Sequence, residues 1–171
     1  MQQGAPQSRQ VVFSTRVVPM GKPHKVDAVQ AGMAAKKKKN AAPTGPVEMQ
    51  HYGIDYAVNP SDMRFGVTQA GLYHAVLGFM VTAFNDDGRL LASMESTTTS
   101  DLKPTSYQEV MRGGFRLHQE LDVPTEAVSL RLGVEDATSS RVGTMEIKLP
   151  VSVPPEEPKI ATRALPPIEP D

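Results

Sequence analysis

Cysteine and tryptophan are absent from the 171-residue chain, and no apolar run approaches the length of about 18 residues expected of a membrane-spanning helix. Without cysteine, the chain has no disulfide, thiolate zinc site, iron–sulfur cluster or cysteine nucleophile. The polar start, MQQGAPQSRQ, lacks an apolar h-region, so we expect no signal peptide in this chain. The 39% of hydrophobic residues is nevertheless sufficient for a folded core.

Charge and proline are unevenly distributed along the chain. Residues 1–50 hold 8 Lys/Arg against 2 Asp/Glu, a net charge of +6, whereas residues 51–171 hold 10 against 17, a net charge of −7. Residues 150–171 contain 7 of the 15 prolines, which lack a backbone donor and favour extended chain. These compositional shifts indicate one folded domain with polar, poorly packed ends.

The predicted boundaries follow from these shifts. The domain is predicted to span residues 11–153 and to contain an outlying strand at 11–18 and a core at 47–153. Between them, a Lys/Ala/Pro-rich insertion at 20–46 offers little apolar area to offset ordering entropy, so we expect it to be flexible. The predicted disordered tails are residues 1–10 and the proline-rich residues 154–171.

Period-two alternation predicts most of the strands. Within residues 128–134, the apolar side chains of Val128, Leu130, Leu132 and Val134 share one face, and Ser129, Arg131 and Gly133 share the other. Such alternation is typical of a half-buried strand. Residues apolar on both faces favour a central strand at 72–84. The other predicted strands are 52–58, 90–98, 115–123 and 145–151, with weaker candidates at 11–18 and 63–67.

One segment departs from this alternation. In residues 104–113 the apolar spacing is helical, Ser106 and Glu109 fit a capping box, and Gly113-Gly114 can end the turn. We predict a short helix that connects two strands. Seven or eight short strands with no helices of crossover length favour an all-β, antiparallel, immunoglobulin/fibronectin III-like β-sandwich.

Catalytic and metal chemistry have little support in the pattern. The four histidines, His24, His51, His74 and His118, show no paired metal-ligand spacing, and we place His118 on the outer face of its strand. Asp136-Ala-Thr138-Ser-Ser140 is loosely similar to a D-x-S-x-S metal motif, but Asp, Ser and Thr are ordinary residues of a loop between antiparallel strands. The chain lacks a G-x-S-x-G elbow and a phosphate-binding glycine loop. We therefore predict no catalytic residue, no cofactor and no metal, and expect that the protein is not an enzyme.

Three exposed segments are candidate contact sites. Four consecutive lysines form a possible polyanion contact, although their lack of interleaved aromatic residues favours a solvated insertion, so we do not expect nucleic acid as partner. Two turns that flank strong strands carry small polar residues suited to protein contact. The lysines are Lys36, Lys37, Lys38 and Lys39, and the turns are Asn85, Asp86, Asp87 and Gly88, and Thr138, Ser139, Ser140 and Arg141.

Several stretches together carry a family resemblance over roughly residues 11–153. They resemble the C-terminal, β-rich region of acidobacterial VWFA-related domain proteins, without the von Willebrand factor A domain itself. The resemblance implies an exported bacterial protein and an extracytoplasmic location: periplasmic, secreted or at the cell surface. The stretches are 12–14 (VFS), 18–19 (VP), 51–56 (HYGIDY), 83–88 (AFNDDG), 115–124 (FRLHQELDVP), 130–136 (LRLGVED) and 141–147 (RVGTMEI).

The resemblance and the strand pattern together favour one function. We expect a non-enzymatic structural or protein-interaction module of an exported VWFA-related protein, whose protein partner and oligomeric state the pattern does not identify. The alternatives are a polyanion-binding module that uses the lysine run and an uncharacterised hydrolase with a site assembled from loops.

Overall fold

The computed structural model describes residues 7–27 and 45–151. The predictions for residues 1–6, for the part of the flexible insertion at 28–44, which includes Lys36–Lys39, and for the proline-rich tail at 154–171 lie outside the described residues. None of the helices in the described part of the chain is long and apolar enough to cross a membrane.

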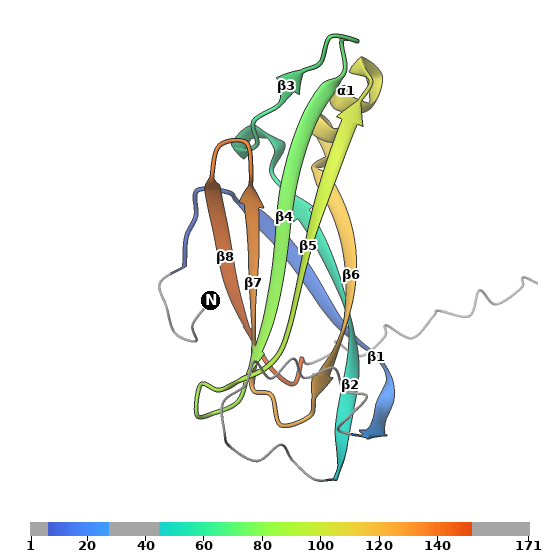
Figure 1. Cartoon of the computed structure of the whole chain (residues 1–171), viewed down its shortest axis with the longest axis vertical. Coiled ribbons are helices and arrows are strands. Elements are labelled where there is room, and N and C mark those ends of the chain that lie inside the picture. The colour runs from blue at the N-terminus through green and yellow to red at the C-terminus, as the bar shows by residue number, and fades with distance from the viewer. Residues whose placement is uncertain (1–6, 28–44, 152–171) are drawn as a thin grey trace, which may run out of the picture.

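The chain forms two antiparallel sheets that pack face to face (Figure 1). The smaller sheet has the order β1-β2-β6, and in the larger sheet β4 lies at the centre, with β5 on one side and β7 followed by β8 on the other. β3 pairs with the first residues of β4. The strands are β1 (Phe13–Asp27), β2 (Pro46–Val58), β3 (Gly66–Val67), β4 (Tyr73–Phe84), β5 (Leu90–Leu102), β6 (Phe115–Pro124), β7 (Ser129–Asp136) and β8 (Arg141–Lys148).

Inward-facing side chains from both sheets make the core. Ile54 and Tyr56 on β2 and Phe79 on β4 are at most 2% exposed, and the rings of Tyr56 and Phe79 meet edge to face with centroids 5.1 Å apart. Leu130 and Leu132 on the neighbouring strand β7 are fully buried in the same core. Burial of these alternating residues is the main driving force for the fold. The predicted all-β antiparallel sandwich is therefore confirmed.

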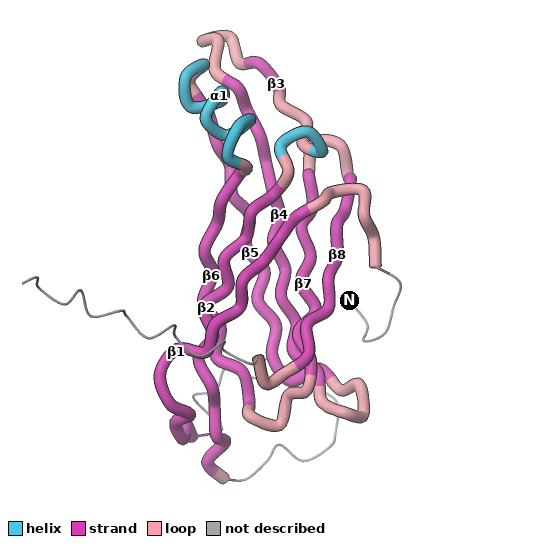
Figure 2. The backbone as a smooth tube through the Cα atoms, turned by 180° about the vertical axis from the view of Figure 1, so that it is seen from behind, coloured by secondary structure: helices cyan, strands magenta, loops and turns pink. Residues whose placement is uncertain are grey.

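Two short helices connect strands at one end of the sandwich, the 3₁₀ helix η1 (Pro60–Asp62) and α1 (Pro104–Gly113). The two views of the backbone show α1 and β3 at the end of the molecule opposite the β4–β5 turn (Figures 1 and 2). The ring of Tyr107 on α1 stacks on Tyr73 of β4, with centroids 3.8 Å apart, and meets Phe65 edge to face at 5.0 Å. The predicted helix at 104–113 is confirmed, but the predicted capping box is wrong. Lys103 is the N-cap residue and makes no side-chain cap, because Pro104 at the first helical position begins the helix without one.

The N-terminal boundaries differ from those predicted. β1 continues from the predicted end at Val18 to Asp27, so residues 20–27 are strand and not flexible insertion. The reason is a long-range pairing: after a register shift between Met20 and His24, β1 continues alongside the start of β2. Residues 8–10 are not a disordered tail either, because Ser8 and Gln10 hydrogen-bond to β8.

β7 also differs from its prediction as a half-buried strand. Every residue of β7 except Glu135 is buried, including Arg131, which is 3% exposed. β7 lies between β4 and β8, where Arg131 has Thr82 and Glu146 as its cross-strand neighbours. The Arg131 guanidinium lies 3.8 Å from the Glu146 carboxylate, so its charge is paired rather than exposed.

Candidate functional site: a histidine–carboxylate network

The outer face of the β1-β2-β6 sheet holds five titratable side chains in one row of contacts. The antiparallel register sets His51 opposite Asp122, Gly53 opposite Glu120, and Asp55 opposite His118. Because alternate residues of a strand share a face, these side chains point away from the core, which the intervening Tyr52 and Ile54 enter. We call His51, Asp55, His118, Glu120 and Asp122 the histidine–carboxylate network.

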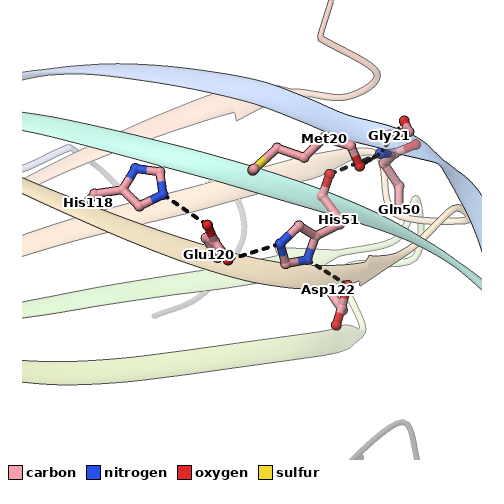
Figure 3. Close-up of polar contacts among 7 residues, drawn as sticks. All are labelled: Met20, Gly21, Gln50, His51, His118, Glu120 and Asp122. Carbon is pink, nitrogen blue, oxygen red and sulfur yellow. Dashed lines mark hydrogen bonds and ion pairs between the residues drawn. The ribbon is translucent and has the colours of Figure 1, made fainter.

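Glu120 joins the two imidazoles, as Figure 3 shows. One carboxylate oxygen of Glu120 lies 3.2 Å from Nε2 of His51, and the other lies 3.3 Å from Nε2 of His118. The Nδ1 atom of His51 lies 2.8 Å from Asp122 Oδ1, and Nδ1 of His118 lies 2.7 Å from Asp55 Oδ1. Each ring nitrogen therefore faces a carboxylate oxygen, and doubly protonated imidazoles can donate to all four.

Gly53 makes room for the network. A Cβ atom at this position would lie 2.9 Å from Sδ of Met20 and 3.3 Å from Cε1 of His118. Glycine lets the Met20 and His118 side chains lie across β2 from the two neighbouring strands. The Nε2 amide of Gln50 donates to the carbonyls of His51, Met20 and Gly21 at 2.9, 3.4 and 3.3 Å (Figure 3). Gln50 thus ties β2 to the irregular part of β1 beside the network.

The contacts shift the protonation equilibria. The hydrogen bond to Asp122 raises the pKa of His51 above its ordinary value, and the bond to Asp55 raises the pKa of His118. The bonds from His118 and His51 lower the pKa of Glu120. All five side chains are between 31% and 55% exposed, so water screens these interactions and their individual contributions to stability are small.

The contacts of the network are those of a charged surface. Both nitrogens of each imidazole already face carboxylates, and neither His51 nor His118 has a hydroxyl as hydrogen-bond partner among the contacts of the described residues. A Ser–His–Asp arrangement needs such a hydroxyl. The described residues also contain no group of three or more His, Asp or Glu side chains arranged to hold a metal ion.

A shallow hollow of about 660 Å³ adjoins the network at the His118 end. Arg16 of β1 and Arg116 of β6 line it together with Asp55 and His118. Arg16 is the cross-strand neighbour of Asp55. The face therefore presents two arginines at one end and the Glu120 and Asp122 carboxylates at the other, an arrangement that a partner with complementary charges can recognise.

The two predicted contact turns lie at opposite ends of the larger sheet. β4 pairs with β7 so that Phe84 is opposite Ser129 and Leu77 is opposite Asp136. The turn at Asn85–Gly88 therefore follows one end of β4, and the turn at 138–141 lies near the other. The first is the predicted hairpin turn, in which Gly88 N donates to Asn85 O and Gly88 adopts φ 73°.

Asp136 is not the ordinary loop residue that its sequence context predicts. Asp136 is 1% exposed, and its carboxylate accepts hydrogen bonds from Arg64 N at 2.8 Å, Thr138 N at 3.0 Å and the Ser139 hydroxyl. The sequence pattern that is loosely similar to a metal motif therefore forms a structural turn. It ties the β7–β8 connection to the segment that follows η1.

The network is not predicted from the sequence, in which the four histidines show no paired spacing. His51 and His118 share Glu120. The other two histidines lie elsewhere: His74 on β4 is 2.7 Å from Asp101 on β5, and His24 on β1 is opposite Met49 on β2. A usable signal was present: the polar residues at 51 and 55 and at 118, 120 and 122 alternate with core residues. Pairing the two predicted strands antiparallel would have brought these polar positions onto one face.

Comparison of the chain with protein-family models, with curated proteins and with solved structures finds no significant match.

Proposed function

We propose that this domain is a non-enzymatic protein-interaction module of an exported bacterial protein, and that it contacts its partner through the outer face of the β1-β2-β6 sheet. The observation that carries this proposal is the histidine–carboxylate network itself. Its five side chains are held in one arrangement by mutual hydrogen bonds, so little side-chain entropy is lost when a partner binds.

The charges on this face suit selective recognition. The carboxylates of the network and the arginines of the adjoining hollow place both signs of charge at fixed positions. Complementary charges steer association and disfavour partners whose like charges would be juxtaposed. The occupied ring nitrogens of His51 and His118 support a binding role over a catalytic one.

The remaining parts of the proposal concern the type of β-sandwich and the cellular location of the protein. We propose an immunoglobulin/fibronectin III-like sandwich, supported by the division of the strands into β1-β2-β6 and β5-β4-β7-β8, in which the chain passes repeatedly between the sheets. The VWFA-related origin and the extracytoplasmic location rest on the sequence resemblance. Cell fractionation that finds the native protein in the cytoplasm alone would contradict this location.

The test of function is partner capture with matched variants. Immobilised wild-type chain is compared with Glu120→Gln/Asp122→Asn, which removes two charges of the network, and with Glu109→Gln, which removes one exposed charge on α1. We expect a protein from the extracytoplasmic fraction that wild type and Glu109→Gln retain and the network variant retains at least tenfold less. Equal retention by all three chains, or turnover of a substrate that the network variant abolishes, would refute the proposal.

A further inference from the structure

The four sheet edges of the sandwich are not equally protected. Each edge strand presents backbone N–H and C=O groups that can pair with another chain, and proteins usually block such edges with a covering segment, proline, charge or a bulge. Apart from the two-residue β3, the edge strands are β1 and β6 in the smaller sheet and β5 and β8 in the larger. Comparison of the four edge strands shows which one has the least protection in the described part of the chain.

Three edges carry recognisable protection. Residues 8–10 cover β8: Ser8 and Gln10 bond to Val142 O at 2.6 and 3.1 Å, and Thr144 N donates to Ser8 O at 2.8 Å. β1 contains two prolines and a register shift between Met20 and His24, and proline cannot donate to a further strand. β6 presents arginine, histidine, glutamate and aspartate at alternate positions from 116 to 122.

β5 has fewer of these devices: its charged side chains are the two carboxylates Glu95 and Asp101. Its bulge lies at Leu91 beside the turn, and from Ala92 to Leu102 its register with β4 is unbroken. The strand contains no proline, lysine or arginine. Within residues 7–27 and 45–151, β5 pairs only with β4, so one long edge of the larger sheet has no described pairing partner.

We propose that the outer edge of β5 binds an extended segment of a partner protein as an added β-strand, with basic side chains of that segment opposite Glu95 and Asp101. Both carboxylates lie on the exposed face of β5, six residues and about 20 Å apart along the strand. Asp101 also lies 2.7 Å from Nδ1 of His74 on β4, so a basic side chain of the partner would share this carboxylate with His74. Thr97 and Thr99 occupy the exposed positions between them, where hydroxyls can bond to cross-strand neighbours. Backbone pairing would supply affinity, and the two carboxylates would supply selectivity.

The charge pattern disfavours a second copy of this chain as occupant. Self-pairing of β5 brings four carboxylates and no lysine or arginine of β5 to one face of the new ladder, and like charges placed opposite each other are destabilising. This inference goes beyond the proposed function and does not depend on it, because the network lies on the other sheet. Variants at β5 leave the network unchanged, so the two proposals can fail separately.

The test uses the full chain and a synthetic peptide. The probe is an eleven-residue peptide of alternating Thr and Val in which two Thr six positions apart are replaced by Lys. We expect saturable binding by calorimetry, and protection from amide hydrogen exchange at alternate residues between Ala92 and Leu102. Glu95→Lys should weaken binding at least fivefold. The matched control, Glu135→Lys on the doubly paired strand β7, should change it less than twofold.

Two further peptides separate strand addition from charge attraction. A version with alternate backbone amides N-methylated should not bind, and a version with Glu in place of Lys should bind only Glu95→Lys/Asp101→Lys. Failure of the lysine peptide to protect β5, or equal binding of the N-methylated peptide, would overturn the proposal. So would a concentration-dependent dimer, seen by sedimentation, whose β5 amides are protected without peptide.

Discussion

Replacement of Asp136 by alanine is predicted to destabilise the domain strongly, although Asp136 lies at a surface turn. The carboxylate is 1% exposed and accepts from two backbone amides, Arg64 N and Thr138 N, and from the Ser139 hydroxyl. Asp136→Ala removes both acceptor oxygens and with them all three hydrogen bonds. It also releases the turn between β7 and β8 from the segment after η1.

The size of the expected stability loss follows from the two backbone N–H donors, Arg64 N and Thr138 N, which cannot rotate to a new partner. A hydrogen bond to a charged group contributes about 1.5–3 kcal/mol, and a buried donor left unpaired costs about 1–3 kcal/mol. Both bonds are only partly buried, so we take the lower ends and expect a loss of about 3 kcal/mol in the free energy of unfolding. For a chain of this length that corresponds to a decrease of about 10 °C in Tm.

The assay is urea unfolding followed by circular dichroism, with Tm as a second readout. Asp136→Asn should lose less stability than Asp136→Ala, because it keeps one acceptor oxygen. It should still be less stable than wild type, because its NH2 group would face a donor. Asp87→Ala, an exposed aspartate in the β4–β5 turn, is the control and should stay within about 0.5 kcal/mol of wild type. If Asp136→Ala unfolds as Asp87→Ala does, the structural role assigned to this carboxylate is wrong.

Three further predictions follow from other parts of the structure. Gly143→Ala should cost about 2–4 kcal/mol and expose the amides of residues 8–11 to exchange, because a Cβ atom would overlap the Val11 carbonyl oxygen and displace the buried Val11 side chain. The pKa values of His51 and His118 are raised above 6.5 in the folded chain, so their contribution to stability is fully present below pH 6.5 and is lost as the pH rises through the folded values. The urea midpoint of wild type should therefore fall from roughly pH 6 to 8, and that of His51→Gln/His118→Gln should fall less; an equal fall would contradict the network. Calcium, magnesium, manganese and zinc should each change Tm by less than about 1 °C against a chelator control, whereas filling of a specific site at 100 times Kd would add about 2.7 kcal/mol.

The strand predictions are correct where the sequence signal is local. Alternation of core and polar residues identifies β6 and β7, and the apolar run at 72–84 identifies β4. The second half of β1 has no such signal: residues 19–24 read PMGKPH, and their strand conformation depends on pairing with β2. Local periodicity cannot reveal a strand whose partner lies more than twenty residues away and whose side chains do not alternate.

The network was missed for a related reason. The contact between His118 and Glu120, two residues apart, is the shortest in sequence within the network. His51 contacts Glu120 and Asp122 across 69 and 71 residues of sequence. Only the register of β2 against β6 brings them together. The burial of Asp136 was missed because a D-x-T-x-S turn looks the same in sequence whether its carboxylate faces water, a metal ion or backbone amides.

The two surfaces assigned to binding are linked by one residue of β6. His118 and Glu120 point outward into the network, and Gln119 between them points inward, where its amide donates to the Ser96 hydroxyl on β5 at 2.6 Å. Gln119 is 7% exposed, so this contact between the sheets is held away from water. Alternation along β6 therefore fixes the network on one face. Through the same three residues it holds β6 against β5, whose outer edge has no pairing partner among residues 7–27 and 45–151. A strand added at β5 would extend the larger sheet beside this contact, while the network would stay exposed on the opposite face for a second partner surface.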